Sequence, residues 1–390
     1  MTHPFIKLWE KPSRLVVGLM SGTAADGIDA VLTRITGSGR STKAEQLGFY
    51  FLPFDAATRR AILELCGGNS GGTREVCLLG THLGLLYARA VRELLKETHT
   101  ETIDLIGCHG QTVYHIPEPT PYLNTSLRGT LQIGDPSCLA EEFGCPVVSD
   151  FRIRDMAAGG LGAPLVPYTE FLLYRSETED VALQNIGGIG NITLLPAGCE
   201  LDDVTAFDTG PGNMVMDALV MKLTNGKMNY DDGGRLAESG SVIPELLTWM
   251  LDDPYLDRQP PKTTGREYYG AEYVARLLSF GDYPLVDVLA TATAFTAQTI
   301  ALSLRRFAPR MPARLVVSGG GSRNVTLLRC LQEALPEVMV QTQEDLGHSS
   351  DAKEALAFAI LANEALFGQC NNAPSATGAR HSVVMGRINL

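Results

Sequence analysis

The chemistry that this sequence can carry centres on one acidic residue at the end of a β-rich stretch. Residues 181–213 contain three short apolar runs separated by glycines, and the third run ends in Phe-Asp-Thr-Gly-Pro-Gly, which places a carboxylate at Asp208. A carboxylate held within ~3 Å of a hydroxyl or a water can take a proton from it. We therefore interpret Asp208 as a general base that contacts the substrate.

Two other interpretations of Asp208 have to be weighed. An aspartate in an Asp-Thr-Gly context often makes only a local hydrogen bond in a turn. The same three residues occur in aspartic proteases, which use a pair of carboxylates that share one proton. Because the string occurs once in this chain, the protease interpretation is excluded, whereas the turn interpretation stays open.

A second candidate, residues 21–29, has the composition of a phosphate-binding turn, Ser-Gly-Thr-Ala-Ala-Asp-Gly-Ile-Asp. Backbone N–H groups and the Thr23 hydroxyl in a tight turn can hold phosphate oxygens. Asp26 and Asp29 can order a magnesium ion directly or through water. An ordinary hairpin closed by Asp-Gly has the same sequence, so this motif is weak when taken alone.

The same arrangement recurs in the second half of the chain, where Gly-Gly-Ile-Gly-Asn occupies residues 187–191. In both halves a strand-like run leads through a glycine-rich turn into another strand-like run. The repeat favours a phosphate clamp in each half over two unrelated hairpins. We expect the second clamp to use Gly187, Gly188 and Asn191.

Three consecutive glycines, Gly319, Gly320 and Gly321, follow the apolar run Arg-Leu-Val-Val-Ser. Bare backbone at the carboxyl end of a strand lets a flat ring or a sugar approach closely, and α/β sheets bind ligands at those ends. The segment is neither a Walker loop nor a Gly-x-Gly-x-x-Gly fingerprint. We interpret it as an adenosine site, and glycines that only end a strand before a helix are the alternative.

Other polar residues are candidates for binding a sugar, and each has an ordinary structural alternative. His109 and Gln111 follow an apolar run, and either can be satisfied locally at the end of a strand. Arg152 and Arg154 suit a substrate carboxylate, because an arginine fork binds carboxylates well, but they can equally be surface residues. Glu354 opens a helical pattern, where an acid is favourable in any case.

The elements that must position these residues alternate as in the α/β class, in an order that recurs from Val181 onward. The first two strands of each half are too close for a crossover helix, so we expect them to pair as hairpins in mixed sheets. The expected strands are 14–20, 29–36, 46–54, 104–110, 145–151, 181–188, 190–197, 205–212, 314–321 and 338–344, and the expected helices are 56–66, 73–97, 136–143, 213–223, 325–335 and 352–367.

The length of the chain, 390 residues, fits two domains of roughly 150 to 200 residues each. We expect the first domain at residues 1–149. The second domain, with a helical insertion and most of the nucleotide and sugar site, is expected at 150–375, and a tail at 376–390 is expected to pack back on the first. The glycine-rich segment between Asp150 and Asp180 is interpreted as a hinge and substrate loop.

Composition argues against several classes of protein. The formal net charge is −12, whereas non-specific nucleic-acid binding requires a basic surface. No uninterrupted apolar run approaches the ~18 residues of a membrane span, and residues 1–14 do not resemble a secretory signal, so we expect a cytoplasmic protein without nucleic-acid or membrane partners. The eight scattered cysteines favour reduced thiols over a disulfide frame or a zinc site.

Taken together, the motifs closely resemble those of one family over almost the full length. The strings GLMSGTAADGID, GCHGQTVYH, LQIGD, DFRIRDMAAGGLGAPLVP, NIGGIGNIT, FDTGPGNMVMDA, KTTGREYYG, VVSGGGSRN and EALAFA occur in the order seen in anhydro-N-acetylmuramic acid kinases, within the actin, sugar-kinase and heat-shock ATPase superfamily. The resemblance implies two ribonuclease-H-like (actin-like ATPase) domains, with mixed sheets around an interdomain cleft.

This resemblance also implies an activity. The family opens the 1,6-anhydro ring with water and phosphorylates O6 with ATP, giving N-acetylmuramate 6-phosphate and ADP in the recycling of cell-wall sugars. Asp208 would activate the water that attacks C1, the expected cofactors are ATP and Mg²⁺ (near Asp26 and Asp29), and the expected partners are the sugar and a second copy of the chain. The residues expected to bind the nucleotide are Gly22, Thr23, Ala24, Ala25, Asp26, Gly27, Ile28, Asp29, Gly187, Gly188, Asn191, Gly319, Gly320 and Gly321, and those expected to bind the sugar are His109, Gln111, Arg152, Asp208 and Glu354.

Two other functions stay open at this point. A kinase for a simpler anhydro sugar such as levoglucosan shares this architecture. A nucleotide-switched binding protein is the alternative from another class, since actin-like and chaperone ATPases share the fold. Against it stand the missing peptide-binding domain and the strings GCHGQT and GGLGAPLVP, which are typical of the anhydro-sugar kinases.

Overall fold

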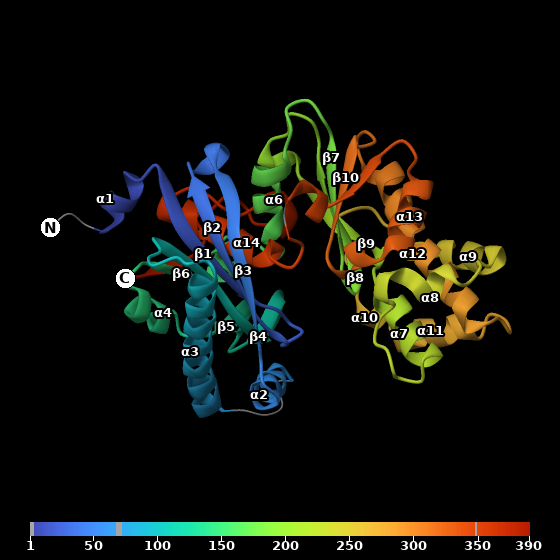
Figure 1. The fold of residues 1–390 in the computed structure, drawn as a ribbon, viewed down its shortest axis with the longest axis horizontal. Coiled ribbons are helices and arrows are strands. Elements are labelled where there is room, and N and C mark those ends of the chain that lie inside the picture. The colour runs from blue at the N-terminus through green and yellow to red at the C-terminus, as the bar shows by residue number, and fades with distance from the viewer. Residues whose placement is uncertain (1–3, 68–71, 348) are drawn as a thin grey trace. The chain divides into compact units, whose positions relative to one another are not determined.

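The chain forms two compact units in a computed structural model that describes residues 4–67, 72–347 and 349–390. Unit 1 contains residues 1–173 and 351–390, and unit 2 contains residues 174–350. Figure 1 shows the order of their elements along the chain. The first boundary therefore lies later than the expected position 150, and the chain returns to unit 1 earlier than the expected position 376. The physical reason is that the last long helix, residues 353–366, packs on the sheet of unit 1.

Unit 1 is built on a mixed sheet in the order β12-β6-β4-β1-β2-β3, with β5 paired to β4. Three strands form an antiparallel meander, β4 runs parallel to β1, and β6 runs parallel to β4. The strand from the C-terminal tail, β12, pairs antiparallel with β6, so the tail lies on this sheet. The bounds are β1 Ser13–Ser21, β2 Gly27–Thr36, β3 Lys43–Pro53, β4 Leu105–Tyr122, β5 Thr125–Ile133, β6 Val147–Ser149 and β12 Arg387–Asn389.

Helices cover both faces of this sheet. Along β1, Val17 and Leu19 join the core formed with α3, whereas Gly18 between them lies against α14. Because successive residues of a strand point to opposite faces, α3 and α14 lie on opposite sides of the sheet. The helices are α1 Pro4–Trp9, α2 Ala56–Cys66, α3 Thr73–Glu97, α4 Pro136–Phe143, α5 Phe151–Ala157, α6 Val166–Tyr174, α14 Lys353–Leu366 and α15 Pro374–Thr377, with the 3₁₀ turn η1 at Gly39–Ser41.

Unit 2 repeats this topology. Its sheet has the order β11-β10-β7-β8-β9, which corresponds strand for strand to β6-β4-β1-β2-β3 of unit 1. In both sheets the second strand is antiparallel to its neighbours, and two later strands, β4 and β6 in unit 1 and β10 and β11 in unit 2, run parallel to the first. The predicted hairpins, the α/β class and the duplication are therefore confirmed. The bounds are β7 Val181–Ile186, β8 Ile189–Leu195, β9 Thr205–Pro211, β10 Arg314–Ser318 and β11 Met339–Thr342.

The core of unit 2 is organised by one long helix, α12. By length and composition alone α12 could cross a membrane, but 72% of its most apolar window is buried inside the structure, so it is a core helix. The helices are α7 Met214–Leu223, α8 Arg235–Glu238, α9 Pro244–Leu251, α10 Arg266–Tyr269, α11 Ala271–Leu278, α12 Leu285–Phe307 and α13 Val325–Ala334, with 3₁₀ turns η2 Leu201–Asp203, η3 Asp232–Gly234, η4 Pro254–Asp257, η5 Gly320–Arg323 and η6 Glu344–Leu346.

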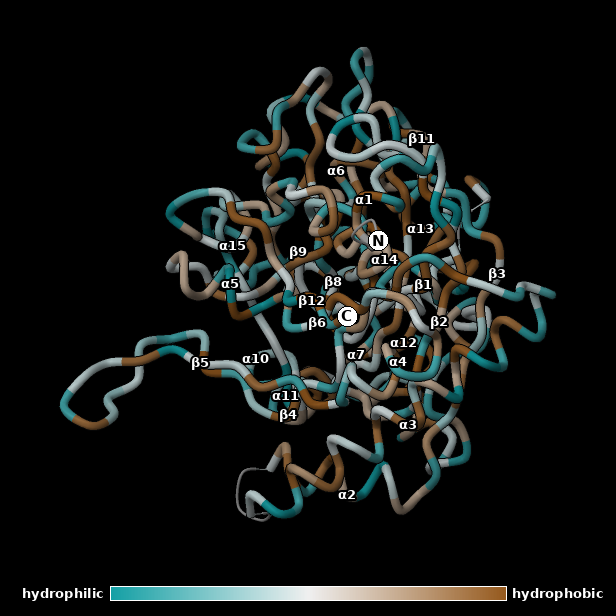
Figure 2. The backbone as a smooth tube through the Cα atoms, turned by 90° about the vertical axis from the view of Figure 1, so that its left-hand side faces the viewer, coloured by the Kyte–Doolittle hydropathy of each residue, from teal (hydrophilic) through white to brown (hydrophobic). Residues whose placement is uncertain are grey.

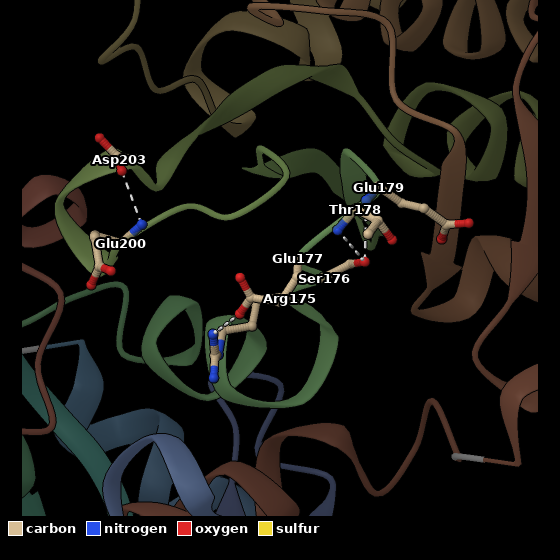
Figure 3. Close-up of polar contacts among 7 residues, drawn as sticks. All are labelled: Arg175, Ser176, Glu177, Thr178, Glu179, Glu200 and Asp203. Atoms are coloured by element: carbon tan, nitrogen blue, oxygen red, sulfur yellow. Dashed lines mark hydrogen bonds and ion pairs between the residues drawn. The ribbon is translucent and has the colours of Figure 1, made fainter.

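Polar side chains order two loops at the start of unit 2 (Figure 3). Arg175 Nη1 lies 3.0 Å from Glu177 Oε1, and the Ser176 hydroxyl accepts hydrogen bonds from two following N–H groups. In the loop between β8 and β9, the backbone N–H of Glu200 donates to Asp203 Oδ2 over 2.9 Å. These contacts fix the chain where it enters β7 and β9, the strands that carry the glycine turn and Asp208.

Two expectations about unit 1 were wrong. The segment expected as a loop between Asp150 and Asp180 contains α5 and α6. The strand expected to end at residue 110 continues to Tyr122 and returns as β5, forming a hairpin that Figure 2 shows projecting from unit 1. The seven residues of α5 are too few for a clear helical period. In the hairpin, the prolines of His-Ile-Pro-Glu-Pro-Thr-Pro-Tyr conceal the strand pattern.

Candidate functional site

Asp208 lies in β9, where one neighbouring segment holds both its main chain and its side chain. The N–H of Asp208 donates to the carbonyl of Lys262 over 3.0 Å, and its own carbonyl accepts from the Tyr255 hydroxyl over 2.8 Å. The N–H of Thr264 donates to the carboxylate oxygen Oδ2 over 2.9 Å. The carboxylate is thus held at one oxygen by a rigid backbone donor, and its orientation is set before any substrate binds.

The surroundings make Asp208 a stronger base than an ordinary carboxylate. Burial raises the pKa of Asp208 to about 6, and Glu267 adds to this, while the Thr264 N–H and Lys262 act in the opposite direction. A base with a pKa near the working pH combines a large ionised fraction with a useful proton affinity. Asn191 lies directly opposite Asp208 in the register of β8 and β9, which brings one predicted ligand of the nucleotide next to the predicted base.

The glycine turn after β7 is tied to the start of α7. The carbonyl of Gly187 accepts from the N–H of Asn213 over 2.7 Å, and that of Gly188 accepts from the N–H of Gly212 over 3.0 Å. The Asn213 side chain also donates to the carbonyl of Ile186 over 3.1 Å. The predicted clamp residues Gly187 and Gly188 therefore lie at the beginning of a ten-residue helix, where the helix dipole favours anions.

The three glycines after β10 meet this turn, because β10 and β7 are parallel neighbours that end together. Gly319 has φ +79°, and a Cβ there would lie 2.7 Å from Asn185 Oδ1. A Cβ on Gly321 would overlap the side chain of Ile186, whereas one on Gly320 would meet only Asn213 Nδ2, at 3.5 Å. Packing on β7 therefore requires glycine at positions 319 and 321, which agrees with the alternative that these glycines only end a strand before a helix. At Gly320, in contrast, the protein leaves space beside the backbone.

The corresponding turn of unit 1 connects β1 and β2. Thr23, Ala24 and Asp26 are exposed, and a Cβ on Gly22 would meet nothing within 4 Å. Ala25 and Ile28 are fully buried in the core, and Gly27 packs against the backbone of β3. Of the residues expected to bind phosphate, Thr23, Ala24 and Asp26 are therefore accessible to a ligand, whereas Ala25 and Ile28 stabilise the turn from the core.

A set of carboxylates gathers beside this turn. Burial raises the pKa of Asp29 to about 7, and the charges of Asp26, Glu354 and Asp351 add to the effect. Glu354 is exposed in the first turn of α14, and its charge also acts on Arg152. The structure therefore brings three predicted site residues of unit 1, Asp26, Asp29 and Glu354, into one electrostatic environment.

His109 holds Arg152 in place. It is only 3% exposed, and its Nδ1 lies 2.7 Å from the carbonyl of Gly110. Because a carbonyl only accepts, Nδ1 carries the proton, and Nε2 accepts from Arg152 Nε over 2.9 Å. Burial, and then the Arg152 charge, lower the pKa of His109 to about 3, so the ring is neutral. Both ring nitrogens form hydrogen bonds within the protein. This agrees with the alternative interpretation, in which His109 is satisfied by its own surroundings at the end of a strand.

The two arginines of the sequence analysis lie in different surroundings. Arg152 is partly buried and also donates from Nη1 to the carbonyl of Gly162 over 2.7 Å. The N–H of Gly162 in turn donates to the buried carboxylate of Asp155 over 2.9 Å. Arg154 is exposed on α5. Arg152 is therefore the arginine built into the glycine-rich segment, and its remaining N–H donors can still bind a carboxylate.

Gln111 connects β4 to the unit 1 turn. Its side chain is fully buried, and Nε2 donates to the carbonyl of Gly22 over 3.2 Å. Its Oε1 is buried and has no hydrogen-bond partner within the described part of the chain. The Gln111 amide therefore supports the backbone of the turn from behind, and its oxygen is an acceptor that a ligand or a water can satisfy.

Comparison with known proteins identifies the family to which these residues belong. The family model described as anhydro-N-acetylmuramic acid kinase matches residues 14–390. A protein of that name from Caldanaerobacter subterraneus subsp. tengcongensis is 50% identical, and the match covers 99% of both chains. The chain belongs to the anhydro-N-acetylmuramic acid kinase family. A relative of the same name from Clostridioides difficile is 45% identical over 95% of this chain and 97% of its own.

The solved structures that match this chain have low sequence identity to it. Component A of (R)-2-hydroxyglutaryl-CoA dehydratase from Acidaminococcus fermentans is 13% identical, with a TM-score of 0.44 over 91% of this chain and 99% of that chain. ROK hexokinase from Thermus thermophilus is 15% identical, with a TM-score of 0.37 over 89% of this chain and 98% of that chain.

Three further residues that contact Asp208 in this member of the family are not among the site residues that the sequence predicts. Tyr255, Lys262 and Thr264 hold its main chain and carboxylate. The string KTTGREYYG, residues 262–270, contributes only to the family resemblance. Its position in the ordered set of family motifs was the available signal, but a backbone donor such as the Thr264 N–H carries no signature in residue type.

Proposed function

We propose that the chain opens 1,6-anhydro-N-acetylmuramic acid with water and phosphorylates its O6 with ATP, giving N-acetylmuramate 6-phosphate and ADP, with Asp208 as the general base. The family supplies the kinase class. The observation that carries the chemical assignment is the Asp208 carboxylate, oriented by the Thr264 N–H and with a pKa of about 6. A positioned base of this kind contributes about 10²–10⁴-fold to a rate.

The proposed reaction uses this base once. Asp208 takes a proton from the water that attacks C1, the bond from C1 to the bridging oxygen O6 breaks, and O6 uses the released electron pair to form a bond to the γ-phosphorus. The bond from the γ-phosphorus to the β,γ-bridging oxygen then breaks, and ADP leaves. One proton, one water and one phosphoryl group account for the product, so no further base is required to start the reaction.

The nucleotide in this proposal is held by the two glycine turns and by Gly320. Backbone at Gly22 and the hydroxyl of Thr23 would contact phosphate oxygens in unit 1, and Gly187 and Gly188 would do so in unit 2. Gly320, whose α-carbon is uncovered, would face the adenosine.

The carboxylates of unit 1 can bind Mg²⁺ only together with other ligands. Asp26 and Asp29 supply oxygen donors of the type that Mg²⁺ prefers, but no set of three or more His, Cys, Asp or Glu side chains in the described chain could hold an ion alone. Mg²⁺ in kinases is usually bound by one or two carboxylates, water and substrate phosphates. Asp26 and Asp29 would thus hold it together with water and ATP, where it would neutralise charge on the phosphates.

The decisive experiment is a product analysis. The protein is incubated with ATP, Mg²⁺ and 1,6-anhydro-N-acetylmuramic acid, and the sugar product is expected to gain the mass of one phosphate group plus one water. Levoglucosan serves as the second substrate. Equal turnover of levoglucosan would favour the simpler anhydro-sugar kinase, and ATP hydrolysis that does not depend on any sugar would overturn the proposal in favour of a nucleotide-switched protein.

The lactyl carboxylate of the sugar is assigned to Arg152. Arg152→Ala is expected to weaken the affinity for 1,6-anhydro-N-acetylmuramic acid by about 10- to 100-fold, because a charge-assisted hydrogen bond is lost. Affinity for levoglucosan, which has no such acid, should change little. Arg154→Ala is the matched control, since Arg154 lies on the same helix but is exposed. An equal loss for both sugars in Arg152→Ala would make this arginine structural.

The adenosine assignment is tested at Gly320. Gly320→Val is expected to raise the Kd for ATP by at least about tenfold, or 1.4 kcal/mol, because the protein itself leaves room for the side chain and the nucleotide would not. Binding of the sugar and the melting temperature should stay unchanged. Gly321→Val is the contrasting variant: it should destabilise the protein through Ile186. Unchanged ATP affinity in folded Gly320→Val protein would remove the assignment.

A homodimer and a cytoplasmic location complete the proposal. All eight cysteines are free thiols, as is usual in a reducing compartment. Light scattering coupled to size-exclusion chromatography tests the dimer directly, because a monomeric mass at micromolar concentration would contradict it.

A further inference from the structure

Lys262 carries a buried positive charge that no step of the proposed reaction uses. The residue is only 5% exposed. Its Nζ lies 3.2 Å from the carbonyl of Leu256 and 3.5 Å from that of Tyr255. Within the described residues its hydrogen-bond partners are these two carbonyls and no carboxylate. A buried ammonium without a bonded carboxylate is costly, so its surroundings must compensate the charge by other means.

Three aromatic rings provide this compensation. Nζ lies 4.7 Å from the ring centroid of Phe307, 4.9 Å from that of Tyr255 and 5.7 Å from that of Phe207. A cation within about 6 Å of an aromatic face is attracted to it, and the attraction increases when the cation is desolvated. The rings come from α12, η4 and β9, so the ammonium joins three separate elements at one point.

The backbone of the same segment holds the general base. The carbonyl of Lys262 accepts from the N–H of Asp208, and the N–H of Thr264, two residues later, donates to the Asp208 carboxylate. Tyr255, whose ring faces the ammonium, donates its hydroxyl to the Asp208 carbonyl. The lysine side chain and the bonds to Asp208 therefore belong to one connected structure.

We propose that Lys262 is a positioning residue for Asp208: its ammonium, seated among three aromatic rings and two carbonyls, fixes the segment from Lys262 to Thr264, whose backbone orients the Asp208 carboxylate. The inference rests on the proposed role of Asp208 as the base. It assigns to the string KTTG a function in the reaction that does not require contact with the sugar or the nucleotide. A small displacement of the base is sufficient to matter, because misplacement by about 1 Å can cost about 100-fold in rate.

The charge of Lys262 also acts on Asp208 through space. Lys262 lowers the pKa of Asp208, against the larger effect of burial. Removing the charge should therefore raise that pKa, and the acidic limb of the activity profile should move to higher pH. The other charged or titratable groups facing Lys262, Asp208 and Tyr255 are Asp253 and Asp257 on or beside η4, Arg258 in the following loop, Glu267 on α10 and Arg306 on α12.

The test compares Lys262→Met with Lys262→Arg in the full-length protein. Met keeps the length and the apolar contacts but removes the charge, so kcat should fall by about 10- to 100-fold, with little change in KM for ATP or sugar and with the acidic limb shifted upward. Lys262→Arg, which retains a cation for the rings, should restore the limb and part of kcat. Lys222→Met is the matched control, because Lys222 is exposed in the same unit, and it should behave like the wild type.

Several outcomes decide the proposal. If folded Lys262→Met protein has an unchanged kcat and an unchanged acidic limb of its pH profile, the proposal is overturned. Asp208 remains the base in that case, provided that Asp208→Asn is inactive. A loss confined to thermal stability would make Lys262 only structural. If Lys262→Met does not fold, Phe307→Leu removes one ring without altering the lysine: a lower kcat at constant KM supports the proposal, and an unchanged kcat overturns it. Full activity of Asp208→Asn would instead defeat the proposed function itself.

Discussion

Asp208→Asn is expected to lower kcat by a factor of about 10²–10⁴, because the change removes the proposed base and preserves the shape of the side chain. Binding of ATP and of the sugar should persist, since neither requires a proton to leave. The backbone bonds of Asp208 to Lys262 and Tyr255 do not involve its side chain, so the variant should fold. Isothermal titration and steady-state kinetics measure the two effects separately.

The matched control for this substitution is Asp217→Asn. Burial also raises the pKa of Asp217 to about 6, but Asp217 lies on α7 and has no place in the reaction. Its replacement should leave kcat within a few-fold of the wild type. Similar losses in both variants would indicate that any buried carboxylate of unit 2 supports activity through stability, and the assignment of the base would be lost.

The pH dependence gives a second measure of the base. Asp208 accepts a proton only when ionised, so kcat/KM should decline as the pH falls through about 6, the raised pKa of this carboxyl. Asp208→Asn should lack that limb. In ¹⁸O-labelled water the first product should carry label at C1 and none in its phosphate, because the bridging oxygen is O6, which stays on C6 and receives the phosphoryl group. Early label in the sugar phosphate would refute the coupled mechanism.

Much of the fold follows from periodicity that the sequence displays. The bounds expected for α2, α3 and α4 agree with the structure, because their apolar residues recur at helical spacing. In α3, for example, Leu79, Leu83, Tyr87 and Val91 form one buried stripe. The α5 segment could not be predicted in this way, since its structure depends on Arg152 and on contacts of Asp155 with residues more than 200 positions away.

The same distinction between local patterns and distant contacts applies to the candidate site. The local positions of Asp208 in a strand and of the glycine turns between strands could be predicted, because residue type and spacing identify them. The role of His109 could not, since its Nε2 is occupied by an arginine 43 positions further along the chain. The donor that orients Asp208 is a backbone N–H 56 positions away. Such contacts join residues that are distant in the sequence, so no local sequence pattern predicts them.

The second large effect is expected at Gly18, where the fold requires a bare backbone. Gly18→Val should strongly destabilise the protein, because a Cβ at this position would overlap the carbonyl oxygen of Ala355 in α14. Overpacking costs typically about 1–3 kcal/mol and occasionally more. Here the obstacle is helix backbone, which cannot rotate away, so we expect at least about 3 kcal/mol out of a total stability of about 5–15 kcal/mol. Urea denaturation followed by circular dichroism measures the loss.

Gly129→Val is the control for this substitution, because Gly129 lies in the β4–β5 hairpin and a Cβ there would meet nothing within 4 Å. The comparison bears on function as well as stability, since α14 carries Glu354, whose charge acts on Asp29 and Arg152. Any Gly18→Val protein that folds must hold α14 further from β1, so its affinity for ATP and sugar should be weakened together. A wild-type urea midpoint in Gly18→Val would show that α14 does not rest on the backbone of β1, and the placement of Glu354 beside the phosphate turn would lose its basis.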